Sequence, residues 1–148
     1  MSEHPSAAGD LAWAVHHLAV AAAELDAAVA RRMGLTAGDY LALKHLSISG
    51  EPMGPVELGR LLGVTSGAAT GLVDRLEQRG FAKRRPHLTD RRRQTVAITP
   101  YARQRLVDEL RPLADDIADA AAALTDRQRR TVTDTLGRLA GLHRRHAR

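Results

Sequence analysis

Apolar residues recur with helical spacing at the start of the chain and set its first predicted element. Between residues 10 and 32 the larger apolar side chains fall at alternating intervals of about four and three, with Ala22 at the one step that lacks a larger residue. These positions are Leu11, Val15, Leu18, Leu25 and Val29. The spacing predicts a helix with one apolar stripe, close to a heptad seam.

Glycine, proline and hydroxyl residues divide the next part of the chain into shorter helices. Gly34 can end the first helix, and Thr36 can cap a second one that extends to about residue 47. Residues 48–54 have the composition of a connector, and Pro55 suits the first turn of a third helix over 55–62. Thr65 or Ser66 can cap a fourth helix, which we expect to stop at Gly80.

Two short β-like runs follow, over residues 81–85 and 94–98, and predict a hairpin with a long tip. In the second run Val96 and Ile98 share one face, and Thr95 and Ala97 share the other. The dipeptide at 99–100, Thr-Pro, opens another helix, in which Pro112 should cause a kink. A capping box over 125–128 starts the last helix. We therefore expect an α+β fold that is mainly helical.

Charge singles out the hairpin. It contains six basic residues and a single acid, Asp90, so it alone carries +5, the formal net charge of the whole 148-residue protein. The basic residues are Lys83, Arg84, Arg85, Arg91, Arg92 and Arg93. A solvated charged loop would have the same composition, but the hairpin directly follows two helices with helix-turn-helix spacing. This combination is typical of a nucleic-acid-binding surface.

The two helices over 55–79 have the lengths and the glycine-containing turn of a helix-turn-helix motif, in which the second helix enters the major groove. An ordinary helical hairpin is the alternative. In a helix-turn-helix, the hydroxyls of Ser66 and Thr70 would face DNA, one helical turn apart. In the hairpin, Asp90 is expected to orient one of the arginines through a charge-assisted pair.

These motifs resemble the MarR-type winged-helix transcription regulators. Residues 61–80, LLGVTSGAATGLVDRLEQRG, look like the family's recognition helix, and Asp-Arg-Arg at 90–92 followed by Val-Ala-Ile-Thr at 96–99 looks like its wing. The resemblance implies a winged helix-turn-helix DNA-binding domain over 35–99, flanked by dimerisation helices over 1–34 and 100–148. It also implies contacts to double-stranded DNA from Thr65, Ser66, Gly67, Thr70, Arg75, Arg84, Arg85, Asp90, Arg91, Arg92 and Arg93.

One position departs from the family pattern. Gly71 stands where many members carry a long polar or basic side chain, beside the equally small Gly67, Ala68 and Ala69. Direct base readout is therefore expected to be thin. Specificity can instead depend on DNA shape and backbone contacts, or the glycines can let the helix approach the groove closely.

The resemblance further implies a homodimer and a small aromatic or anionic effector bound between the dimerisation helices and the winged domain. Candidate effector residues are Trp13, His16, His17, Tyr40 and His45. Each also has an ordinary explanation as a core or surface residue. Folding of the terminal helices onto the middle of a monomer is the alternative to dimerisation. His143 and His146 are three residues apart, but without a third ligand we expect no metal there, and we expect a disordered basic tail.

Other functions find little support in the chain. It has no cysteine, which excludes disulfides and cysteine-ligated zinc. Nucleophile elbows and glycine-rich phosphate loops are missing, so we expect neither an enzyme nor a bound cofactor. No signal peptide and no apolar run near the roughly 20 residues of a bilayer span appear, so we expect a cytoplasmic protein without membrane segments. The sequence predicts a DNA-binding repressor under small-molecule control; the alternative is a winged-helix protein-interaction module.

Overall fold

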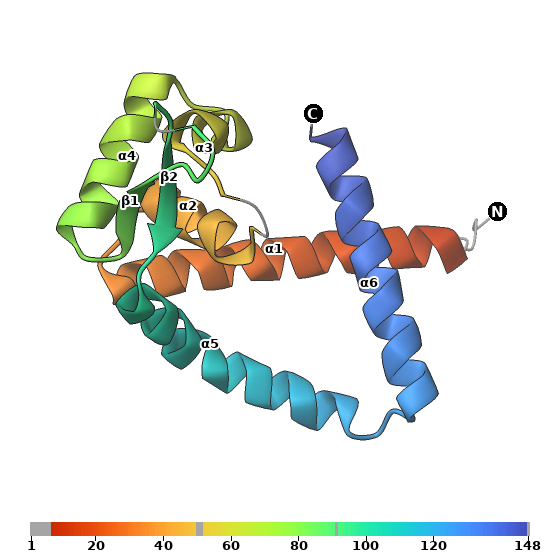
Figure 1. The fold of residues 1–148 in the computed structure, drawn as a ribbon. Helices are drawn as coiled ribbons and strands as arrows, with labels where there is room; N and C mark the ends of the chain where they lie inside the picture. The colour runs from red at the N-terminus through yellow and green to blue at the C-terminus, as the bar shows by residue number, and fades with distance from the viewer. Residues whose placement is uncertain (1–6, 50–51, 91, 148) are drawn as a thin grey trace. The chain divides into compact units, whose positions relative to one another are not determined.

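The structure, a computed structural model, describes residues 7–49, 52–90 and 92–147. Over these residues it contains six helices and one two-stranded sheet (Figure 1). The elements are α1 (Ala7–Met33), α2 (Ala37–Ile48), α3 (Pro55–Leu62), α4 (Ser66–Gln78), β1 (Ala82–Pro86), β2 (Gln94–Ile98), α5 (Pro100–Ala121) and α6 (Asp126–His146). The chain divides into two compact units, Met1–Leu106 and Val107–Arg148, which are described separately.

The core of the first unit lies among α2, α3, α4, the end of α1 and the sheet. Its largest fully buried side chains come from four helices and are Val29, Tyr40, Leu43, Leu58, Val73 and Leu76. Each buried aliphatic side chain of this size stabilises the fold by about 1.5–3 kcal/mol relative to an exposed one. The apolar period of α4 therefore faces inward, and its polar positions remain on the surface.

The turn between α3 and α4 depends on two glycines. Gly63 ends α3 in the left-handed conformation, with φ 67°, which a residue without a Cβ adopts at little cost. A Cβ built on Gly59 would lie 3.1 Å from the Cβ of Ala69, so the two helices approach closely at this point. These glycines set the angle at which α4 leaves the turn.

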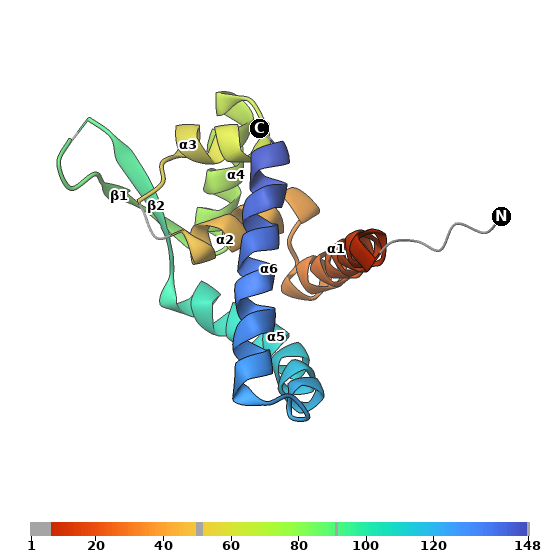
Figure 2. The same ribbon diagram turned by 90° about the vertical axis from the view of Figure 1, so that its right-hand side faces the viewer.

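The strands β1 and β2 pair antiparallel, with Ala82 opposite Ile98 and Pro86 opposite Gln94. Met53, just before α3, adds a single bridge to Val96, whose amide donates to the Met53 carbonyl at 2.7 Å. Figure 2 shows the hairpin extending away from α2 and α4. The bridge ties the base of the hairpin to the helix-turn-helix, and Val96 is buried there.

The second unit contains most of α5 and all of α6. The helix α5 continues through Pro112. Thr125 and Gln128 form the predicted capping box at the start of α6, with the Thr125 amide donating to Gln128 at 2.8 Å. The prediction of a disordered basic tail is wrong for residues up to His146, which belong to α6. Arginine and alanine favour helix, and cations at the C-terminal end interact favourably with the helix dipole.

Large apolar side chains remain exposed in both units. In α1 they are Leu11, Trp13, Leu18 and Val20, and beyond residue 107 they are Leu113, Ile117, Val132, Leu136 and Leu142. None of the residues of α6 is buried. In the stripe predicted over residues 10–32, Val29 is buried, Val15 and Leu25 are half-buried, and Leu11 and Leu18 are exposed. Across the described segments, no helix combines the length and apolarity needed to cross a membrane.

Candidate nucleic-acid interface

The N-terminal turn of α4 presents small polar groups to solvent. Thr65 is its N-cap, and its hydroxyl accepts a hydrogen bond from the amide of Ala68 at 3.2 Å. Ser66, Gly67 and Thr70 are exposed on the same end of the helix. Unpaired amides and the positive end of the dipole favour an anion at such a terminus. This turn can therefore receive a phosphate, with hydroxyls beside it.

The two glycines of α4 are not required by its packing. A Cβ on Gly67 would meet nothing within 4 Å, and one on Gly71 would make only an ordinary contact, 3.7 Å from Nη1 of Arg75. Glycine inside a helix costs about 1 kcal/mol relative to alanine. These glycines give the fold no close packing contact that would offset that cost. Because they carry no side chain, they leave room for a partner to approach the helix backbone.

Arg75 is bound to a buried acid of the neighbouring helix. Its Nη2 and Nε donate to the two carboxylate oxygens of Asp39 at 2.7 and 3.1 Å, and Asp39 is buried at the start of α2. The hydrogen bond and charge of Asp39 raise the pKa of Arg75. Half of the guanidinium-bearing side chain remains exposed. Arg75 therefore links α4 to α2, with part of its side chain open to solvent.

Arg84 in β1 turns toward α4 rather than toward solvent. Its guanidinium contacts Asp74 at 2.7 Å and also pairs with Glu77, while its backbone amide donates to Glu77 at 2.8 Å. A phosphate contact by Arg84 would have to compete with both carboxylates. The arrangement instead fixes the first strand of the hairpin against α4.

Arg93 makes the equivalent link on the other side of the hairpin. It pairs with Glu57 in the first turn of α3, and a second oxygen of Glu57 accepts from the amide of Gly54 at 3.1 Å. The hydrogen bond from its own backbone amide is the largest cause that holds the pKa of Glu57 below its ordinary value. Burial opposes it, and the charge of Arg93 and the hydrogen bonds from Gly54 and Arg93 add to the lowering. One carboxylate thus joins the α3 cap to the hairpin.

Asp90 shapes the tip of the hairpin through the backbone. Its carboxylate accepts from the amide of Arg92 at 3.0 Å, and its carbonyl accepts from the amide of Arg93 at 3.0 Å. The predicted pairing with a guanidinium is wrong for Arg92 and Arg93, because a short aspartate side chain reaches the amide two residues ahead more readily. Arg91 lies outside the described residues. The turn leaves the Arg92 side chain exposed.

The hairpin is consequently less available to a polyanion than its sequence predicts. Two of its arginines, Arg84 and Arg93, are neutralised by acids of α3 and α4. Lys83, Arg85 and Arg92 make no ion pair within the described part of the chain. The exposed surface with α4's first turn at one end and Arg92 at the other has the layout of a winged helix-turn-helix.

Comparisons with known proteins agree with this layout. The family model described as "MarR family" matches residues 33–93. The chain is also 30% identical over 115 residues to an uncharacterized HTH-type transcriptional regulator, YcgE, from Bacillus subtilis, covering 78% of this chain and 74% of the relative. The chain belongs to the MarR family. It is a DNA-binding transcriptional regulator of that family and not an enzyme.

Further relatives extend the similarity. The repressor YetL of B. subtilis is 34% identical over 74 residues, which span 49% of this chain and 44% of YetL. Among solved structures, the regulator Tm0710 from Thermotoga maritima is 26% identical with a TM-score of 0.67, covering 93% of this chain and 96% of that one. RV1404 from Mycobacterium tuberculosis is 26% identical with a TM-score of 0.65, covering 95% of each chain. These similarities confirm the winged-helix fold class.

The predicted effector residues of this MarR-family protein do not form one site within a chain. Trp13, His16 and His17 stack edge to face on the exposed start of α1, with ring centroids 5.5 to 6.5 Å apart. Tyr40 is buried in the core. Asp26 of α1 binds Lys44 of α2 at 2.7 Å and lies nine positions beyond His17 in the chain.

His45, like Tyr40, belongs to α2. It is half-buried on α2, where burial, and then the charge of Lys44, lower its pKa. Lys44 binds Asp26 of α1 and also lies 5.9 Å from the Tyr40 ring. Lys44 and Tyr40 are therefore part of the packing between α1 and α2. Any effector site that uses all five residues needs an arrangement beyond that within one chain.

Sequence reasoning missed the acids that organise the interface. Asp39, Glu57, Asp74 and Glu77 were not singled out, yet each binds an arginine of the predicted DNA surface. One signal was present in the sequence: Glu57 follows Pro55 in the first helical turn, where an acid is favourable. The other pairs join residues of different elements, and no local spacing indicates them.

Proposed function

We propose that this protein is a repressor that binds a pseudo-palindromic operator as a homodimer and responds to a small ligand. The recognition turn of α4, with Thr65, Ser66, Gly67 and Thr70, would lie in the major groove, and Arg92 would reach the adjacent minor groove. The observation that carries the proposal is the exposure of that turn and of Arg92 on a framework in which acids hold Arg84 and Arg93.

Exposed apolar residues outside the winged domain support the homodimer. Leu11 and Leu18 of α1 and Ile117 and Leu136 of the second unit are each about half exposed in the single chain. Burying such surfaces against the same segments of a twofold mate would remove them from water. We therefore keep residues 1–34 and 100–148 as the proposed dimerisation region and 35–99 as the proposed DNA-binding domain. A twofold dimer would put its recognition helices about 10 base pairs apart.

The repressor role rests on similarity to YetL, which is named a repressor and is 34% identical over 74 residues. The small glycine-rich surface of α4 favours recognition by backbone contacts and DNA shape over direct base readout. Arg75, Arg84, Arg85, Arg91 and Arg93 then have secondary or positioning roles in the proposed interface. Asp90 shapes the turn that carries Arg92.

Operator binding measured against salt tests this proposal. Genomic fragments retained by the protein supply the operator, and affinity should fall steeply as salt rises because phosphate contacts release counterions. Arg92→Ala should weaken binding by about 1–3 kcal/mol and reduce the salt slope by about 1. Arg111→Ala, which removes an exposed arginine of the second unit, is the matched control and should bind like the parent. A flat salt dependence, or an Arg92→Ala variant equal to Arg111→Ala, contradicts the assignment.

A further inference from the structure

Three carboxylates of the helix-turn-helix lie against arginines of the hairpin. Asp74 and Glu77 of α4 both pair with Arg84, and Glu57 of α3 pairs with Arg93. By sequence the hairpin carries +5, and subtracting one charge for each of these three acids leaves +2. Much of the charge that would attract a polyanion is therefore compensated within the chain itself.

The pair of Glu57 and Arg93 lies at the surface, with 54% of the arginine side chain exposed. Exposed ion pairs are usually weak, because two flexible side chains must be ordered at once. Glu57 is already ordered, since its Oε2 accepts from the Gly54 amide at 3.1 Å in the cap of α3. Only Arg93 loses freedom on pairing, so Glu57 competes well with a phosphate for this guanidinium.

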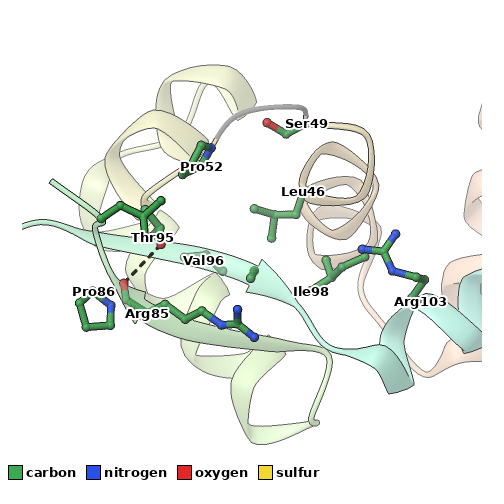
Figure 3. Close-up of a pocket in the computed structure, with 11 residues that line it drawn as sticks. Leu46, Ser49, Pro52, Arg85, Pro86, Thr95, Val96, Ile98 and Arg103 are labelled. Atoms are coloured by element: carbon green, nitrogen blue, oxygen red, sulfur yellow. Dashed lines mark hydrogen bonds between the residues drawn. The ribbon is translucent and has the colours of Figure 1, made fainter.

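Arg84 is held more completely. Its side chain is 21% exposed, and its guanidinium is shared by two carboxylates, Asp74 at 2.7 Å and Glu77. Strand alternation places the neighbouring Arg85 on the opposite face of β1, beside its cross-strand partner Thr95, and Figure 3 shows its side chain extending along the strand. The register of the hairpin thus decides which arginines the acids reach.

Specific and non-specific DNA complexes use cations differently. In a non-specific complex the protein can adopt any register, so a free guanidinium finds a phosphate and releases a counterion. In a specific complex the register is fixed, and a hairpin that is already held in place loses less conformational freedom on binding. An arginine bound to a carboxylate therefore adds little to non-specific binding, while it favours the specific complex by holding the hairpin.

We propose that Glu57, Asp74 and Glu77 are specificity-determining residues, which lower the affinity for non-specific DNA by holding Arg93 and Arg84 on the helix-turn-helix. These acids act through the two arginines as positioning residues. Their role depends on the hairpin lying on DNA, as in the proposed function. Glu57 gives the sharpest test, because a single acid holds the more exposed arginine.

Binding of a random-sequence duplex by four full-length proteins tests Glu57. The parent, Glu57→Gln, Arg93→Gln and the double variant are titrated by fluorescence anisotropy over a range of salt concentrations. Glu57→Gln should bind about five- to tenfold more tightly near 0.1 M salt, with a salt slope steeper by about 0.9, because the released Arg93 adds one phosphate contact. Arg93→Gln should bind no more tightly than the parent. The steeper slope should be absent from the double variant.

The same proteins are then titrated with the operator. Glu57→Gln should bind it no more tightly than the parent, so the ratio of operator affinity to random-duplex affinity should fall about five- to tenfold. Glu24→Gln makes the same change of charge at an exposed position of α1 and is the matched control, which should leave both affinities unchanged. Asp74→Asn tests Arg84 separately, and its gain on the random duplex should be smaller because Glu77 remains.

Several outcomes overturn the proposal. They are a parental affinity and slope of Glu57→Gln on the random duplex, an equal gain in Glu24→Gln, a steeper slope that persists in the double variant, or an equal gain on the operator. Circular dichroism verifies that each variant keeps the helical content of the parent, and Asp74→Asn carries the test if Glu57→Gln unfolds. The random-duplex titrations need no operator. Parental behaviour of Glu57→Gln there contradicts only the role of the acids, whereas an Arg92→Ala variant equal to Arg111→Ala contradicts the proposed function.

Discussion

Gly54 sits where the N-terminus of α3 meets the hairpin, and replacing it with alanine tests how tightly the two are joined. A Cβ at this position would lie 2.6 Å from the backbone carbonyl oxygen of Gln94 and 2.7 Å from Oε2 of Glu57. Its φ of −92° is accessible to any residue, so the substitution itself introduces no backbone strain. In the folded state, the effect of Gly54→Ala therefore comes from the close approach and not from backbone strain.

The magnitude follows from the displacement required. Ordinary van der Waals contact starts near 3.4 Å, so the Gln94 carbonyl must retreat by about 0.8 Å from its 2.6 Å separation. This carbonyl is close to Val96, which is held by its bond to Met53, so the strand cannot move freely. Overpacking of this kind costs about 1–3 kcal/mol. Alanine also reduces the conformational entropy of the unfolded chain, which offsets about 0.4–1 kcal/mol of this cost. We expect a net loss of about 1–2 kcal/mol in the free energy of unfolding.

Urea unfolding followed by circular dichroism measures this loss. Gly67→Ala is the matched control, because its new Cβ meets nothing within 4 Å and the residue lies inside a helix. That variant should be more stable than the parent by up to about 1 kcal/mol. If Gly54→Ala unfolds at the same urea concentration as the parent, or is stabilised like Gly67→Ala, the proposed close packing of hairpin and α3 is refuted.

Three further predictions follow from the interface and the terminal helices. Gly67→Ala, although stabilising, should weaken operator binding if α4 lies against the DNA backbone; unchanged affinity in a fluorescence anisotropy titration would exclude the close approach. Because the folded pKa of Glu57 is lowered, its stabilising contribution is complete above its ordinary pKa of 4.5 and is lost as the pH falls through the lowered value. The stability difference between the parent and Glu57→Gln should therefore shrink in acid, and a pH-independent difference in urea titrations would contradict the role of its charge. Ile117→Asp should shift sedimentation from dimer to monomer, whereas Asp116→Asn should leave it unchanged. If both variants sediment as dimers, α5 is not part of the proposed interface.

Much of the local structure could be predicted because it depends on neighbouring residues. Thr36, Thr65 and Thr125 cap their helices as the sequence indicates, and β2 has its predicted bounds. A cap requires only a hydroxyl and an amide three residues ahead, and strand alternation requires only a buried face. Similarity to known MarR-family proteins then identified the winged-helix arrangement, in which these elements pack in a fixed order.

The availability of charge was decided by tertiary structure. By sequence, the hairpin carries six basic residues and one acid, but folding brings Glu57 to Arg93 and Asp74 and Glu77 to Arg84. These partners are 7 to 36 positions apart, and only the packing of the hairpin on α3 and α4 brings them within ion-pair distance. The sequence by itself determined the elements, their caps and the total charge, because those depend on residue type and short-range spacing. Which arginines hold the wing in place and which remain exposed depended on contacts between elements, since electrostatic pairing acts through space and not along the chain.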